Sequence, residues 1–213
     1  TRDVYKSSLN TLRPNGKYRH IRLDLAPHID SLFKRIFGRE EHKDWLLSLY
    51  NAVNNSNCTE EDILEITTID NIIYLNMKND VSFLIDSQMN LYEHQSTYNP
   101  NMPLRGLFYF SNLYQAYLTK MDLNIFSSKL LKIPTPQFIV FYNGLSKQPD
   151  KSTLKLSDAF MHPLLEPQNP DFEWTATMYN LNKGKNEDLL SFIYKALYDN
   201  FYATIKLNSE NLL

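Results

Sequence analysis

The chain has 213 residues, 43% of them hydrophobic and 22% charged, which suits a globular domain with its own core and argues against a disordered or fibrous chain. Its formal net charge of −2 lacks the basic excess that phosphate-binding proteins usually show. Charge does not exclude a nucleic-acid enzyme, however, because a bound divalent metal ion would supply the positive charge.

Membrane and secretory signals are missing from the sequence. No stretch approaches the ~18 consecutive apolar residues of a membrane span, and the N-terminus lacks the basic and apolar regions of a signal peptide. Cys58 is the only cysteine, so no internal disulfide can form. We therefore expect a cytoplasmic protein with no membrane contact.

The N-terminal part is predicted to contain an arm and two helices. Residues 1–28 are mixed in character, and we interpret them as an arm that precedes a single domain at residues 29–213. Apolar residues then recur at helical spacing from Ile29 until Gly38 ends the pattern. A second helix is predicted over residues 40–53.

The central part is predicted to contain most of the sheet. The segments ILEITTIDNIIYLNM, DVSFLI and NLYEHQ are rich in β-branched and aromatic residues, which predicts a meander of three strands. A helix follows from Pro103 to residue 120, because proline is well tolerated in a first helical turn. The apolar run PQFIVFYNG is typical of a central strand buried on both faces.

Shorter elements are predicted after residue 144. They are a polar loop, a helix at residues 156–161, a proline-rich crossing at residues 163–170, a strand at residues 173–179 and a last amphipathic helix capped by Asn186. This order of helices and strands predicts an α/β fold with one mixed sheet covered by helices.

Acidic and amide side chains share one face of the predicted sheet. Because side chains alternate along a strand, Asp80 lies on the same face as Glu93 and Gln95. A hairpin loop at residues 85–90 places Asp80 opposite Gln95 and diagonal to Glu93. A loop at residues 87–90 moves Asp80 away and brings Asp86 nearer to Glu93, and the sequence does not decide between the two.

This cluster suits a metal ion. Two convergent carboxylates are typical ligands of Mg²⁺, which completes its shell with waters and substrate phosphate. Such an ion lowers the pKa of a bound water and offsets charge on a phosphate, while the Gln95 amide is suited to orienting the attacking water. The alternative is a pair of ordinary acids on the solvent face of a hairpin.

Several blocks of sequence occur in an order that resembles a known family. They are FKRIFG, KNDVSFLID, LYEHQSTYNPNMPLRGLFYFSNLY, PTPQFIVFYNG and LKLSDAF, spanning roughly residues 28–185. They resemble the recombination-promoting nuclease/transposase family, part of the PD-(D/E)XK nuclease superfamily. The resemblance implies a restriction-endonuclease-like mixed sheet flanked by helices. It also implies a DNA endonuclease that uses Mg²⁺ or Mn²⁺ and acts in recombination or in mobile elements.

The resemblance also implies roles for individual residues. Position by position, the metal-binding acids fall on Asp80 and Glu93, and Gln95 replaces the lysine of the superfamily's E-x-K pattern. The family's own pattern is E-x-Q, so Gln95 agrees with membership, although activation of the nucleophile is then less defined. Asp30 matches the family's acid before its Phe-Lys pair. It is either a further metal ligand or a charge favoured in a first helical turn.

Basic residues near these acids are candidates for substrate contacts. Arg105, Tyr109 and Asn112 share one helix face, and we expect Arg105 to contact DNA phosphate and Tyr109 to pack. The alternative for Arg105 is an ion pair with an acid. Lys34 is a second phosphate-binding candidate, although a solvated helix face explains it equally well. His94 points away from Glu93, which favours a core or interface histidine over a catalytic base.

A catalytically weak or inactive DNA-binding or interaction module on the same fold is the alternative function. It is favoured by the modest charge, by the absence of lysine at position 95, and by the end of the chain at Leu213, where family members continue with more helices. A homodimer is left open, because two staggered cuts favour a dimer but no sequence feature decides the oligomeric state.

Overall fold

The computed structural model of the chain describes residues 29–59, 63–66, 80–85, 87–161, 171–182, 184–193 and 195–196. The predicted arm at residues 1–28 and the predicted crossing at residues 163–170 lie outside these ranges. Within the ranges, no helix is long and apolar enough to cross a membrane.

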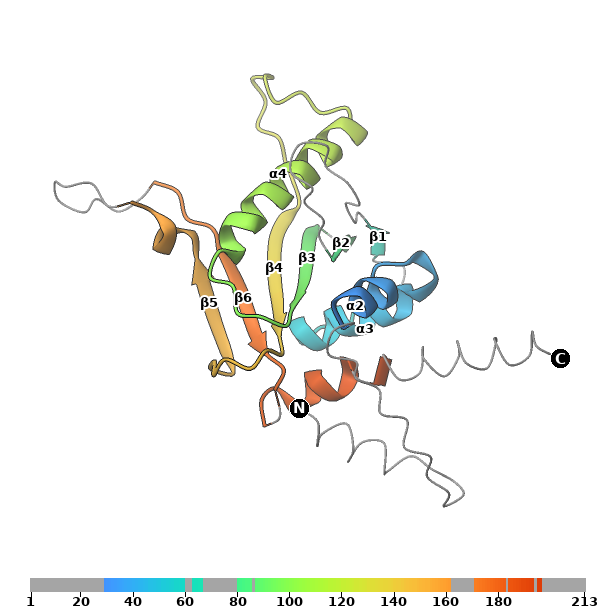
Figure 1. Cartoon of the computed structure of the whole chain (residues 1–213). Helices are drawn as coiled ribbons and strands as arrows, with labels where there is room; N and C mark the ends of the chain where they lie inside the picture. The colour runs from blue at the N-terminus through green and yellow to red at the C-terminus, as the bar shows by residue number, and fades with distance from the viewer. Residues whose placement is uncertain are drawn as a thin grey trace, which may run out of the picture.

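Six strands form one mixed sheet in the order β1-β2-β3-β4-β6-β5 (Figure 1). They are β1 (Ile63–Ile66), β2 (Val81–Ile85), β3 (Gln88–Gln95), β4 (Thr135–Tyr142), β5 (Lys151–Lys155) and β6 (Thr175–Asn180). The first three form the predicted antiparallel meander, whereas β3, β4 and β6 run parallel to one another. β5 pairs antiparallel with β6 at the edge of the sheet.

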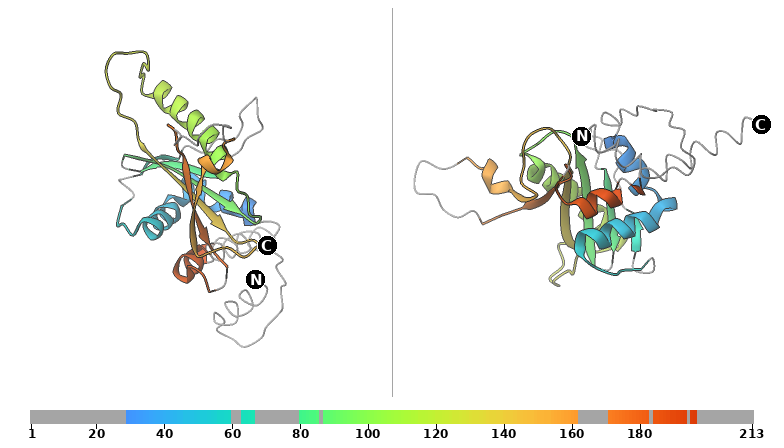
Figure 2. Two further views of the ribbon diagram at one scale, coloured as in Figure 1. Left: turned by 90° about the vertical axis from the view of Figure 1, so that its left-hand side faces the viewer. Right: turned by 90° about the horizontal axis from the view of Figure 1, so that it is seen from below.

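Helices cover both faces of this sheet (Figure 2), which confirms the predicted α/β fold. α2 (Ile29–Phe37), α3 (Lys43–Asn54) and the helical residues 187–193 lie on one side, called the α3 face below. α4 (Met102–Lys120) lies on the other side, called the α4 face. The short 3-10 helix η2 (Glu40–His42) forms the start of the predicted second helix.

Each face has its own hydrophobic core, and β3 and β4 contribute to both. Tyr92 and Ile139 belong to the core on the α3 face, while Leu91 and Val140 belong to the core on the α4 face. This alternation is the period of a strand buried on both sides. It confirms the prediction that the run beginning at Pro136 forms a central strand.

Gly106 allows α4 to lie very close to β4. A Cβ atom at this position would be 2.4 Å from Phe138 Cε1 and 2.9 Å from Trp174 Nε1, so no side chain fits without movement. The helix therefore rests directly on the Phe138 ring. The same contact holds the first turns of α4, which include Arg105, against the sheet.

Two sequence predictions in the C-terminal part are wrong. β5 was predicted as a polar loop, but it is an edge strand in which only Leu154 is buried. Lysines are common on edge strands, where they oppose pairing with other chains, and they hide the strand pattern in the sequence. The predicted helix at residues 156–161 is the shorter 3-10 helix η4 (Leu156–Ala159).

Candidate active site

The β2–β3 hairpin brings Asp80 directly beside Glu93. Val81, the first residue of β2, pairs with Tyr92, so Asp80 lies next to the residue that follows Tyr92. The Asp80 backbone N–H donates a hydrogen bond of 3.0 Å to Glu93 Oε1. The two predicted metal-binding acids therefore meet at one end of β3.

The register of this hairpin differs from both registers predicted from the sequence. Ile85 pairs with Gln88, so only two positions separate the paired residues of the two strands. The predicted opposition of Asp80 and Gln95 is wrong, because the residues assigned to the loop from position 88 onward continue β3. Asp86, the alternative partner of Glu93, lies outside the described residues.

Both carboxylates are held by backbone hydrogen bonds as well as by their position. His94 N–H donates to Asp80 Oδ2 at 2.8 Å, and Asp80 N–H donates to Glu93 Oε1. Glu93 is buried, with 1% of its surface exposed, whereas Asp80 is half-buried. Glu93 therefore lies in the core of the α4 face, and Asp80 lies nearer to solvent.

Arg105 lies against the buried acid. Its Nη2 atom is 3.2 Å from Glu93 Oε2 and donates to the Tyr109 hydroxyl oxygen at 2.9 Å. The guanidinium carbon lies 5.6 Å from the centre of the Tyr109 ring, which adds a cation–π contact. Arg105 therefore pairs with an acid in this structure, and Tyr109 packs in the core as predicted.

The surroundings of Arg105 and Tyr109 determine their protonation states. Burial acts to lower the pKa of Arg105, but the Glu93 carboxylate and the Tyr109 hydroxyl outweigh it, so this pKa is raised. Burial, followed by the Glu93 charge, raises the pKa of Tyr109. Around neutral pH, Arg105 is thus a cation and Tyr109 a neutral hydroxyl.

Gln95 lies on the same face as Glu93, at the end of β3. It pairs with Tyr142, a core residue of the α4 face, and it is half-buried. An amide at this place adds hydrogen-bonding groups without adding charge. Glu93 and Gln95 therefore lie on the same face of β3, with Glu93 buried and Gln95 half-buried.

The end of α2 lies beside the acids. A Cβ atom on Gly38, which follows α2, would be 3.5 Å from the Asp80 carbonyl oxygen and 2.6 Å from the Lys34 carbonyl oxygen. Lys34 lies in the last turn of α2 and is half-buried. The backbone of Asp30 lies in the first turn of α2, and its side chain lies outside the described part of the chain.

The His94 side chain lies on the α3 face, away from the carboxylates. It is buried and stacks on Phe33 with 5.9 Å between ring centres. This confirms the prediction of a core histidine. Asn112, further along α4, donates its amide to the Phe108 carbonyl one turn earlier at 2.8 Å.

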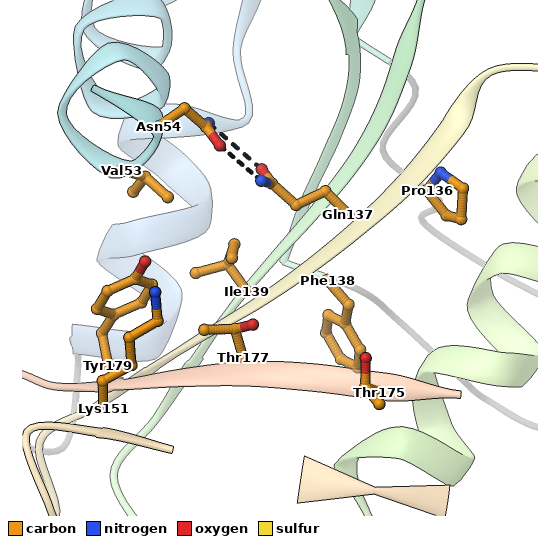
Figure 3. A pocket seen from close by; sticks show the side chains of 10 residues that line it. All are labelled: Val53, Asn54, Pro136, Gln137, Phe138, Ile139, Lys151, Thr175, Thr177 and Tyr179. Carbon is orange, nitrogen blue, oxygen red and sulfur yellow. Dashed lines mark hydrogen bonds between the residues drawn. The ribbon is translucent and has the colours of Figure 1, made fainter. Parts of the chain in front are cut away.

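A polar hollow of about 370 Å³ lies on the α3 face and is separate from the acids (Figure 3). Asn54 and Gln137 point toward each other there, and Gln137 Nε2 donates to Asn54 Oδ1 at 2.6 Å. Lys151 Nζ lies 4.9 Å from the centre of the Tyr179 ring. None of the described residues that line the hollow is acidic, so they do not supply the carboxylate ligands that a hard cation prefers.

The donor set at Asp80 and Glu93 fits a Mg²⁺ or Mn²⁺ ion. Mg²⁺ is commonly bound by one or two carboxylates and keeps several waters that substrate phosphate can replace. Among the described residues, no group of three or more His, Cys, Asp and Glu side chains is clustered for metal binding. A site here would thus rest on two acids with water and substrate oxygens.

Sequence reasoning did not reveal two features of this site. The backbone N–H groups of Asp80 and His94 carry no sequence signal, because any residue except proline supplies one. The contact between Arg105 and Glu93 joins a helix to a strand, and helical or strand spacing does not predict where separate elements meet. The sequence showed only that a cation, Arg105, follows the acid Glu93 near the start of the next predicted helix.

Comparison with known families places these residues in a named group. A family model described as PD-(D/E)XK nuclease family transposase matches residues 27–135, just over half of the chain. The matched segment contains α2, both acids, Gln95 and α4. Comparisons with curated proteins and with solved structures found no match. The chain therefore belongs to the PD-(D/E)XK nuclease family transposases.

Proposed function

We propose that this protein is a DNA endonuclease that depends on a divalent metal ion and acts in recombination or in a mobile element. The proposal is carried by one observation: the family's two acids, Asp80 and Glu93, are in direct contact at the end of β3, next to the cation Arg105. Family membership supports nuclease chemistry, and the acids supply the oxygen ligands that Mg²⁺ or Mn²⁺ prefers.

In this proposal Asp80 and Glu93 bind the metal ion, which when bound polarises phosphate oxygens and lowers the pKa of a water. Gln95 lies on the same face of β3 as Glu93, and in this proposal its amide orients the attacking water through a hydrogen bond. Asp30 is proposed as a further ligand on the family pattern alone.

The substrate contacts in this proposal come from two helices. The Arg105 side chain is 31% exposed while its guanidinium contacts Glu93, so part of this side chain reaches solvent. Lys34 comes from the end of α2, beside Asp80. Both offer a positive charge to phosphate oxygens, which positions DNA without reading its sequence.

The test is cleavage of supercoiled plasmid by the purified protein in Mg²⁺ or Mn²⁺, beside a chelated sample. We expect cutting by the wild type, and a loss of about a hundredfold or more in Asp80→Ala and Glu93→Ala, since a catalytic metal contributes several kcal/mol. Asp158→Asn, which removes an exposed acid on η4, is the matched control and should cut normally. Full cutting by either folded alanine variant would contradict the site.

A DNA-binding module without turnover is the second candidate. The observation that favours it is the Arg105–Glu93 ion pair, which balances the buried carboxylate without any metal ion. This candidate predicts DNA retention that weakens steeply with salt, and no cutting in any metal. Retention that does not change with salt would contradict it.

A further inference from the structure

Glu93 carries a negative charge in a place where a charge needs a partner. Its side chain is 2% exposed and lies above the apolar core of the α4 face. Burying a carboxylate is costly unless an opposite charge and hydrogen bonds compensate for it. Here the Asp80 backbone N–H donates a hydrogen bond to Glu93 Oε1, and Arg105 Nη2 donates one to Glu93 Oε2. Among the described residues, Arg105 is therefore a counter-ion of this acid.

This arrangement places Arg105 in competition with a metal ion. A divalent cation bound to Glu93 needs carboxylate oxygens, and Oε2 is the oxygen that Arg105 contacts. The cation would also repel the guanidinium, since two positive charges a few ångströms apart are unfavourable. Metal binding and the Arg105–Glu93 contact thus oppose each other.

Arg105 is closer to solvent than the acid it contacts. The guanidinium is on the solvent side of Glu93, because its side chain is 31% exposed while that of Glu93 is 2% exposed. Tyr109 accepts a hydrogen bond from the same Nη2 atom and lies one helical turn further along α4. A rotation of the Arg105 side chain away from Glu93 therefore leads toward solvent and not into the core.

We propose that Arg105 is an exchangeable counter-ion, which balances Glu93 in the metal-free protein, leaves it when a metal ion binds, and then binds a substrate phosphate. This inference rests on the proposed metal site. It makes metal and DNA binding cooperative, because each ligand favours the same released position of Arg105. Arg105 also compensates the buried Glu93 charge while no metal ion is bound.

The first test measures metal affinity directly, by titration calorimetry with Mn²⁺ in the absence of DNA. Arg105→Met removes the competing charge and keeps most of the side-chain length, so we expect Mn²⁺ to bind five- to a hundredfold more tightly, the usual range of such coupling. Arg105→Lys keeps a charge and should lie between the two; it also serves if Arg105→Met does not fold. Lys185→Met removes a cation paired with Asp150 elsewhere and should bind Mn²⁺ as the wild type does.

The second test measures cooperativity by fluorescence anisotropy with a short DNA duplex in Ca²⁺ or in chelator. Ca²⁺ should strengthen DNA binding by the wild type several-fold more than it strengthens binding by Arg105→Met. Unchanged or weaker Mn²⁺ binding in Arg105→Met and Arg105→Lys would overturn the exchange, even if the wild type cuts DNA. No Mn²⁺ binding by any protein would overturn the proposed metal site together with this inference.

Discussion

The two faces of the sheet carry different kinds of polar group. On the α4 face, the buried Glu93 carboxylate contacts a cation, Arg105, and the backbone of a second acid. On the α3 face, Asn54 and Gln137 form a half-buried amide pair (Figure 3). The hydroxyl of the buried Tyr92 lies within hydrogen-bonding distance of both side chains. Both groups satisfy hydrogen bonds inside the fold, but only the first carries formal charges.

The amide pair is suited to supporting the fold, whereas the charged group is suited to binding a ligand. Two amides satisfy each other at little electrostatic cost, and burial raises the pKa of Tyr92 well above its usual value, so that group stays neutral. A buried carboxylate with a partly exposed cation costs more than an apolar pair of the same size. Stability alone therefore does not account for this ion pair, whereas the proposed role of Glu93 in metal binding does.

Exchanging charge between the faces is the sharpest way to break this comparison. Glu93→Gln keeps the shape of the side chain but removes its charge, and we expect about a hundredfold or greater loss of plasmid cutting with the fold intact. Gln137→Glu puts a charge in the neutral group, and we expect normal cutting with a lower free energy of unfolding, by about 1 to 3 kcal/mol. Single-turnover cleavage and urea unfolding of both variants measure these effects. If Gln137→Glu stops cutting while it remains folded, the α3 face is also functional.

The position of α4 on the sheet gives the next largest effect. Gly106→Ala adds a methyl group against Phe138 and Trp174, and we expect a loss of about 1 to 3 kcal/mol in the free energy of unfolding, because the core is overpacked. Cutting should fall as well, since Arg105 moves with the helix. Ser111→Ala, on the exposed side of α4, is the control and should change stability by less than about 0.5 kcal/mol. Equal stability of the two variants would show that the helix does not depend on this close contact.

Local patterns in the sequence predicted most of these elements. The helical spacing that ends at Gly38 corresponds to α2, and the alternation of Glu93 and Gln95 placed both on the face where they lie. The apolar run of β4 predicted a central strand because burial on both faces requires it. Each prediction concerns one element, whose period or composition is written in consecutive residues.

The sequence predictions that failed concern contacts between separate elements or elements with a weak sequence pattern. The register that joins Asp80 to Glu93 was missed because polar residues such as Gln88 and Asn90 continue β3 where a loop was expected. β5 was missed because a short edge strand buries only Leu154. The approach of Arg105 to Glu93 follows from how α4 crosses the sheet, and no spacing within one element specifies that crossing.

The amide pair on the α3 face gives a smaller effect, which a double-mutant cycle can isolate. Asn54→Ala and Gln137→Ala each remove one partner, and we expect a coupling of about 1 kcal/mol between them in the free energy of unfolding. Because neither side chain titrates, the coupling should be the same at pH 6 and pH 9. A coupling that changes between these pH values would mean that a charged group takes part, and the contrast between the faces would be weaker than proposed.

The smallest effect concerns a neutral contact at the rim of the α4 face. The Tyr114 hydroxyl donates a hydrogen bond of 2.7 Å to the Pro134 carbonyl, and burial raises the pKa of Tyr114 to about 12. Tyr114→Phe should lower the free energy of unfolding by about 0.5 to 1 kcal/mol at neutral pH, since this bond is only partly buried.

The pH dependence of that difference tests its cause. In the unfolded chain a tyrosine loses its proton near pH 10, whereas folded Tyr114 keeps it to about pH 12, so the wild type loses stability as the pH rises between these values. Tyr114→Phe has no such group, and its stability deficit relative to the wild type should be constant below pH 10 and shrink above it. Urea unfolding of both proteins across this range measures the deficit. If it stays constant up to pH 12, the hydroxyl is not protected by burial, and the rim of the α4 face is wetter than the contact with Pro134 implies.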